Sequence, residues 1–133
     1  MRAVIQRVSS ASCSVDGTVT GSCGKGFLVL LGVANEDTQE DLQYLVKKIT
    51  QLRVFEDEAG KMNLALKDVG GSLLIISQFT LFADTKNVNR PSLTQAGSPD
   101  FSKKMYLQFI DEVRKLGFQA VDGIFGSDMK ISL

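Results

Sequence analysis

The segment 27–33 constrains the fold most, because it reads Phe-Leu-Val-Leu-Leu-Gly-Val and is apolar on both faces of any strand it could form. Such a strand is typical of the centre of a sheet that other layers cover on both sides. A second apolar run, Leu-Leu-Ile-Ile at 73–76, breaks into Ser-Gln-Phe-Thr at 77–80 without an intervening Gly or Pro. We predict two core strands, and the second should open at its carboxyl end onto a polar pocket.

Two amphipathic helices are predicted from capping residues and helical spacing. Thr38 can cap the first helix, with Asp41 three residues later, and apolar residues then repeat up to Leu52. The second helix has Ser98 as its cap and Pro99 in its first turn, and Gly117 ends it. Its predicted core-facing residues are Phe101, Met105, Phe109, Val113 and Leu116.

Shorter strands are predicted around these elements. The segments 4–8 and 11–15 read as an opening hairpin or meander with a turn at Asp16-Gly17, and the segments 118–121, 124–126 and 129–133 read as closing strands. The order is two strands, two strand-helix units and then more strands. We therefore expect one α/β domain over residues 1–133, with a single mixed, barrel-like β-sheet and two main helices.

Composition excludes several classes of function. The chain has no His, so neither a Ser-His-Asp relay nor a His-bearing metal site can exist. Fifteen basic residues balance fifteen acidic ones, so no global field gathers nucleic acid or holds an anionic membrane. The longest apolar run is too short to span a bilayer, and we expect a soluble, cytoplasmic protein. Cys13 and Cys23 read as ordinary core or surface residues, with a thiol role as the alternative.

The polar residues at 77–80 are the first candidate site. Thr80 is a poor nucleophile because no imidazole can activate it, and Ser77 and Thr80 could simply satisfy backbone groups at a strand end. The functional alternative is that the backbone N–H groups of Phe79 and Thr80 point at one spot and stabilise a developing oxyanion. Gln78 could then fix an ester or amine group, while water or the substrate's own hydroxyl attacks.

Two further groups of residues could bind RNA. Phe125 and Met129 flank the Gly126 turn and could sandwich a flat base, although core packing explains the same pair. The polar segment 83–98, which includes Asn87, has no helical or strand periodicity, and long segments of this kind are often functional. Its cations Lys86 and Arg90 suit phosphate oxygens, although two loop cations are often merely solvated.

Taken together, the motifs resemble the D-aminoacyl-tRNA deacylases, which hydrolyse the ester of D-amino acids mischarged on tRNA. The match is collinear over essentially the whole chain. The matching pieces are MRAVIQRV at 1–8, Asp37-Thr38, LRVFEDE at 52–58, GKMN at 60–63, SQFTL at 77–81, Asn89-Arg90-Pro91, and Phe125-Gly126 with Met129.

The resemblance implies a homodimer with an active site near each side of the subunit interface and no metal or organic cofactor. Ser77, Gln78, Phe79 and Thr80 would line the pocket that holds the aminoacyl ester at the 3′ end of D-aminoacyl-tRNA. The nucleophile would be Thr80 or, as we favour, a route assisted by the terminal 2′-hydroxyl, because that group is already held beside the ester. The implied substrate-binding residues are Arg7, Lys86, Asn89, Arg90, Pro91, Phe125, Gly126 and Met129.

In this family Arg7 is expected to support a Gly-Pro pair near the carboxyl terminus, which reaches into the partner's pocket and rejects L-amino acids. Many D side chains, and glycine on the wrong tRNA, would then be accepted. The sequence stops at Leu133, within a predicted strand and before that motif, so we expect further residues in the natural protein or a strand completed by a partner.

Two functions remain as alternatives to an aminoacyl-tRNA hydrolase. One is a non-catalytic module that binds the tRNA end, and the other is an unrelated mixed-sheet interaction domain.

Overall fold

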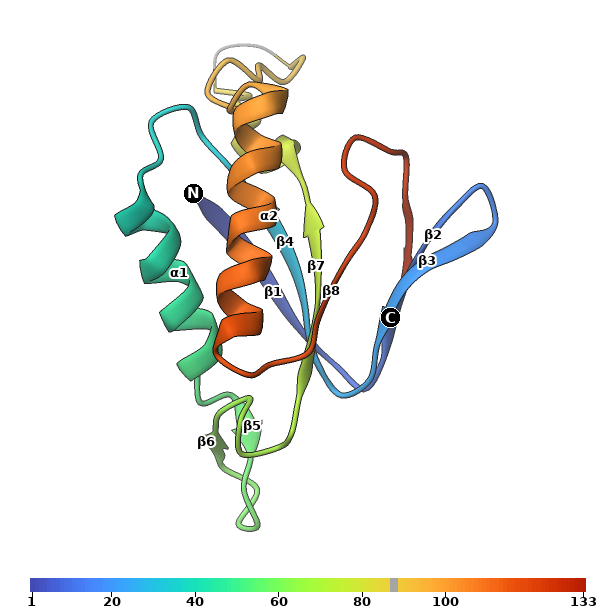
Figure 1. Cartoon of the computed structure of the whole chain (residues 1–133), viewed down its shortest axis with the longest axis vertical. Helices are drawn as coiled ribbons and strands as arrows, with labels where there is room; N and C mark the ends of the chain where they lie inside the picture. Colours follow the sequence, from blue (N-terminus) through green and yellow to red (C-terminus); the bar gives the residue numbers. More distant parts are fainter. Residues whose placement is uncertain (87–88) are drawn as a thin grey trace.

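A four-stranded mixed sheet forms the centre of the computed structural model, which describes residues 1–86 and 89–133. Its strands are β1 (Arg2–Val8), β4 (Gly26–Gly32), β7 (Ser72–Ser77) and β8 (Ala120–Asp122), in the order β1-β4-β7-β8. The strand β4 pairs antiparallel with β1 and parallel with β7, and β7 pairs parallel with β8 (Figure 1). The two predicted apolar strands are therefore the two inner strands of this sheet.

A second sheet corrects the prediction of a single one. It has the order β3-β2-β9 and contains β2 (Ala11–Val15), β3 (Thr18–Cys23) and β9 (Lys130–Ser132), while β5 (Phe55–Glu56) and β6 (Met62–Leu64) form a small separate ribbon. The predicted hairpin of the first two strands is also wrong, since β1 pairs with β4 and β2 pairs with β3. The turn at Asp16-Gly17 joins β2 to β3, and both residues have positive φ, as a two-residue hairpin turn requires.

Both faces of the central sheet are buried, which explains why its inner strands are apolar throughout. Phe27, Val29 and Leu31 alternate onto the face covered by α1 (Gln39–Gln51) and α2 (Pro99–Lys115). Leu28 and Leu74 point to the other face and pack with Cys13 and other residues of the second sheet. The second sheet is therefore the layer that covers this face, as the apolar pattern of the strands at 27–33 and 73–76 predicted.

The predicted helix starts are confirmed. Thr38 caps α1, and Thr38 and Asp41 form the reciprocal capping box, in which the Thr38 N–H donates to Asp41 Oδ2 at 2.8 Å. This bond is the main cause that lowers the pKa of Asp41. Ser98 caps α2 with Pro99 at its first position. Leu116 is wrong as a core residue, because it follows the last helical turn and 58% of it is exposed.

The closing region is only partly as predicted. The strands at 118–121 and 129–133 correspond to β8 and β9, but residues 124–126 form a turn in which Gly126 has a φ of +78°. Asn87, part of the predicted polar segment, lies outside the described residues. Among the described helices, none has the length and apolar character needed to cross a membrane.

The two cysteines lie apart from the chemistry proposed below. Cys13 is fully buried between the sheets, Cys23 is partly buried, and neither is in a disulfide. Burial raises the pKa of the Cys23 thiol, so this thiol stays protonated at neutral pH and is a weak nucleophile.

Candidate active site at the carboxyl end of strand β7

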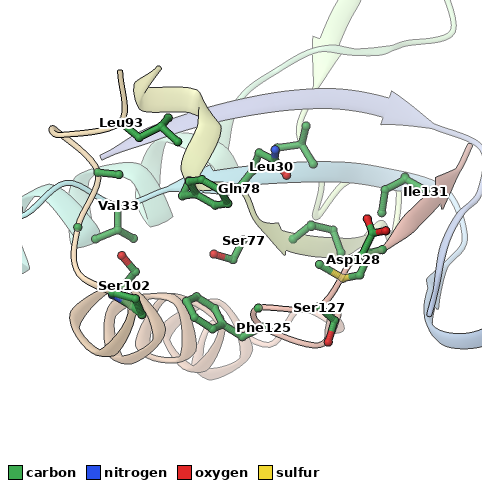
Figure 2. Close-up of a pocket in the computed structure, with 17 residues that line it drawn as sticks. Leu30, Val33, Ser77, Gln78, Leu93, Ser102, Phe125, Ser127, Asp128 and Ile131 are labelled. Carbon is green, nitrogen blue, oxygen red and sulfur yellow. The ribbon is translucent and has the colours of Figure 1, made fainter. Parts of the chain in front are cut away.

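A pocket of about 890 Å³ opens where β7 ends (Figure 2). We call its first side the strand wall, residues 76–79, and its second side the loop wall, residues 125–129. The third side is the start of α2 and the segment before it, and it contributes Leu93, Ala96, Gly97, Pro99 and Ser102. Leu30, Val33 and Ile131 complete the lining. The strand therefore opens onto a pocket as predicted, but the pocket is mostly apolar rather than polar, because residues from β4, the segment before α2 and the loop wall complete it.

The strand wall is built by the way β7 stops. Ser77 is the last residue paired with β4, opposite Leu31, and the Gln78 N–H donates to the Leu31 carbonyl at 2.8 Å. The chain then turns into the short 3₁₀ helix η1 (Phe79–Phe82). Gly32 allows this turn to pack closely, because a Cβ there would lie 3.1 Å from the Gln78 carbonyl oxygen and 3.0 Å from the Phe82 ring.

The first two N–H groups of η1 differ from the next one. The Leu81 N–H donates to the Gln78 carbonyl at 3.4 Å, but the N–H groups of Phe79 and Thr80 have no hydrogen-bond acceptor among the described residues. Such unpaired donors are expected at the start of a helix. Phe79 itself lines the pocket. The sheet has therefore not consumed these two main-chain donors.

Thr80 stands slightly apart from the pocket. Its side chain is exposed and does not belong to the lining, and its Oγ1 accepts a hydrogen bond from Gln78 Nε2. Gln78 does line the pocket, together with Ser77. Of the four predicted catalytic residues, three thus face the pocket directly, and the fourth contributes a hydroxyl that is already bonded to one of them.

Arg2 of β1 contacts η1, and the sequence analysis did not predict this contact. Its Nη1 donates to the Leu81 carbonyl at 2.7 Å, and its guanidinium lies 4.6 Å from the centre of the Phe82 ring. A cation over an aromatic face is a favourable arrangement. The turn after β7 is therefore held by β1 on one side and by β4 beneath it.

The loop wall brings together the residues predicted to border a base. Phe125, Gly126 and Met129 all line the pocket, and Figure 2 shows the Phe125 ring across the pocket from Gln78. The Phe125 ring centre lies 6.0 Å from that of Tyr106 on α2, with the rings tilted by 41°. An aromatic ring that lines a pocket and packs near a second ring is suited to stacking on a flat group.

The other predicted binding residues lie outside the pocket. Lys86, Asn89, Arg90 and Pro91 are exposed and are absent from its lining. They belong to the segment 83–98, which is closed at its base by paired backbone bonds of 2.7 Å between Asp84 and Ser92. Figure 1 places this segment at the same end of the molecule as the carboxyl end of β7.

Arg7 lies at the opposite end of the sheet from Ser77. It pairs with Phe27 at the start of β4, whereas Ser77 pairs with Leu31 near the end of β4. Its Nη1 donates to the Val54 carbonyl at 2.6 Å, and it lines a smaller pocket of about 330 Å³ there. Within one chain, Arg7 therefore takes no part in the pocket at 77–79.

The sequence reading missed the third side of the pocket. Ser102 is only 6% exposed and lies one helical turn after the cap residue Ser98. Gly97 donates its N–H to the Val33 carbonyl at 2.8 Å, and a Cβ there would lie 2.7 Å from Ser102 Oγ. The Gly-Ser-Pro sequence at 97–99 was a signal for a helix start, but not for its place beside β7.

Comparisons with known proteins identify the family. The family model for D-Tyr-tRNA(Tyr) deacylase matches residues 4–133. Over all 133 residues, the chain is 52% identical to the D-aminoacyl-tRNA deacylase of Deinococcus radiodurans and spans 92% of that protein.

Two solved structures are also similar. The c-Myc DNA Unwinding Element Binding Protein matches with a TM-score of 0.94 and 38% identity, over 100% of this chain and 91% of that one. A structure of a probable eukaryotic D-amino acid tRNA deacylase gives a TM-score of 0.84 over 98% of this chain and 91% of that chain; at 16% identity, this likeness concerns the fold alone.

The predicted resemblance is confirmed, because the family model covers almost the whole chain and a full-length relative is half identical. The enzyme class that goes with it is a hydrolase of aminoacyl-tRNA esters. This chain belongs to the D-Tyr-tRNA(Tyr) deacylase family.

Proposed function

We propose that this protein hydrolyses the ester bond of D-aminoacyl-tRNA in the pocket at the end of β7, and releases a free D-amino acid and tRNA. The observation that carries the proposal is that Phe79 lines a pocket of about 890 Å³ and that the Phe79 and Thr80 amides, at the turn beside it, have no acceptor among the described residues. Preorganised N–H donors of this kind stabilise the oxyanion of an acyl-transfer intermediate. A pocket of this size is in the range that binds small ligands.

In the proposed reaction the ester carbonyl oxygen accepts hydrogen bonds from the Phe79 and Thr80 amides. Water attacks the carbonyl carbon, and the adjacent 2′-hydroxyl of the terminal adenosine positions this water and relays its proton to the leaving ribose oxygen. The bond between the acyl carbon and that oxygen then breaks. The RNA hydroxyl acts by proximity, which can replace a large part of the work of an enzyme side chain.

The same proposal gives a role to the loop wall and to the exposed residues outside the pocket. Phe125, Gly126 and Met129 would border the terminal adenosine, since stacking contributes about 1 to 3 kcal/mol per base. The RNA outside the pocket would contact the exposed residues Lys86, Asn89, Arg90 and Pro91. The cations Lys86 and Arg90 would bind its phosphates, and phosphate contacts position a nucleic acid on a protein.

We further propose that the protein acts as a homodimer in the cytoplasm. Arg7 faces away from the pocket of its own chain, at the far end of the sheet. This placement is consistent with a role at the partner's pocket, where it would help to exclude L-amino acids. Glycine on a wrong tRNA has no side chain to exclude and would also be a substrate.

Two other functions are less well supported. A module that only binds the tRNA end would have the same pocket, so only a reaction separates it from an enzyme. One similar structure is described as a DNA-unwinding-element binding protein, but the family model over residues 4–133 and the relative that is 52% identical are both deacylases.

The test is to follow ester loss from D-Tyr-tRNA and L-Tyr-tRNA with protein well below the substrate concentration. We expect repeated turnover of the D-ester, while the L-ester decays at its rate without protein. The variant Thr50→Val should behave as the wild type does, because this buried hydroxyl bonds within α1 to the Val46 carbonyl and does not line the pocket. Binding of D-Tyr-tRNA without ester loss would instead establish the binding module.

A further inference from the structure

A buried hydroxyl bonds to the two chain segments that lead into the walls of the pocket. Tyr106 of α2 is 1% exposed, and its Oη donates to the Ile75 carbonyl of β7 at 2.6 Å. The same oxygen accepts the Gly123 N–H at 3.3 Å. Burial raises the pKa of Tyr106 well above its ordinary value, so the hydroxyl stays protonated and continues to donate at neutral pH.

This hydroxyl lies where two strands separate. The strands β7 and β8 pair from Leu73 opposite Ala120 to Ile75 opposite Asp122, and the ladder ends there. Beyond it, β7 continues to the strand wall, whereas the chain after Gly123 leaves the sheet and crosses to β9 (Figure 1). A single side chain thus bonds to the backbone of both branches at the point where they part.

The Tyr106 ring also supports the side chain that faces the ligand. Its centre lies 6.0 Å from that of Phe125, which lines the pocket (Figure 2). The space around Gly123 is tight, because a Cβ there would lie 2.5 Å from Met129 Sδ and 3.0 Å from Ile76 Cδ1. The position of Phe125 and Met129 therefore depends on how the chain is held at Gly123.

We propose that Tyr106 is a positioning residue for the terminal nucleotide: its hydroxyl sets the spacing between the strand wall and the loop wall and thereby aligns Phe125. This inference rests on the proposed function, in which the loop wall holds the terminal adenosine. It assigns Tyr106 to binding and leaves the chemistry to residues 77–80. The residue touches no reacting atom, so its effect should appear in KM more than in kcat.

Tyr106→Phe keeps the ring and removes only the hydroxyl. We expect KM for D-Tyr-tRNA to rise about five-fold, the factor that corresponds to one neutral hydrogen bond, with kcat changed less than about two-fold. Hydrogen exchange of residues 123–129 should become faster in the same variant. Thr50→Val again serves as the control, because it also removes a buried hydroxyl bonded to a backbone carbonyl and should change neither quantity.

The two measurements keep this inference separate from the proposed function. If the wild-type protein does not hydrolyse D-Tyr-tRNA, the proposed function fails, and hydrogen exchange alone decides whether Tyr106 holds the loop wall. Unchanged exchange of residues 123–129 in Tyr106→Phe would overturn the inference. An unchanged KM in an active enzyme would also overturn it, even if the variant melts at a lower temperature.

Discussion

The strand wall and the loop wall face the same pocket but are held in different ways. The strand wall continues a strand at the centre of the main sheet, and backbone bonds to β4 fix it as far as Gln78. The loop wall lies between β8 and β9. Two backbone hydrogen bonds hold this region: the Ser127 N–H donates to the Ile124 carbonyl at 3.3 Å, and the Gly123 N–H donates to the Tyr106 hydroxyl. Its position otherwise depends on side-chain packing.

This difference matches the kind of group that each wall offers. The strand wall leads into the main-chain N–H groups of Phe79 and Thr80, and such groups stabilise an oxyanion only if their positions are precise. The loop wall presents the ring of Phe125 and the thioether of Met129, and stacking on a base tolerates small displacements. We infer that the rigid wall serves the chemistry and the more adaptable wall serves the binding.

The largest expected effect comes from disturbing the strand that holds the strand wall. In Gly26→Ala the new Cβ would lie 1.8 Å from the Ser72 carbonyl oxygen, so β4 and β7 could not keep their register. We expect a loss of at least about 3 kcal/mol in the free energy of unfolding, measured in urea. Gly24→Ala is the control, because nothing lies within 4 Å of its Cβ. Equal stability of the two variants would contradict the close packing of β4 on β7 that supports the strand wall.

Truncating the loop wall should weaken binding without unfolding the protein. We expect Phe125→Ala to raise KM for D-Tyr-tRNA about ten-fold, because a stacking partner of the base is lost, while kcat falls less than about three-fold. Leu116→Ala removes an exposed apolar side chain outside the pocket and should leave both constants unchanged. A fall in kcat with an unchanged KM would place Phe125 in the chemistry instead.

The smallest effect is expected for Thr80, which follows the strand wall and whose side chain is a poor nucleophile without an imidazole to activate it. Thr80→Ala keeps the main-chain N–H and loses only a hydroxyl that accepts a bond from Gln78. Single-turnover rates should fall less than about five-fold, the scale of one hydrogen bond. Thr94→Ala provides the control, since it removes another exposed hydroxyl, outside the pocket. A thousand-fold loss at Thr80 would return the role of nucleophile to its side chain.

Much of the fold could be predicted because its signals are local. The apolar runs specified β4 and β7, and the capping residues Thr38 and Ser98 located both helix starts. The division into two sheets could not be predicted, since the pairing of β1 with β4 and of β2 with β9 joins segments far apart in sequence. The turn at 124–126 looked like a strand because Ile124 and Phe125 are common in strands.

The residues of the site likewise fall into those that the sequence predicted and those that it did not. The polar residues after β7 and the Phe-Gly turn at 125–126 each carried a local signal, and the fold brings them to one pocket. Ser102 and Tyr106 carried none, because on a helix they cannot be distinguished from core positions until the helix is packed on the sheet. The separation of Arg7 from Ser77 likewise depends on strand register rather than on sequence distance.

The central claim is that the turn after β7 supplies main-chain donors at Phe79 and Thr80 while the RNA supplies the assisting hydroxyl. It is tested most directly by single-turnover cleavage of D-Tyr-tRNA ending in 2′-deoxyadenosine, compared with the natural ribose end. We predict that the deoxy substrate still binds but is cleaved at least about a hundred times more slowly, because the adjacent hydroxyl is gone. Equal rates for the two substrates would contradict the account.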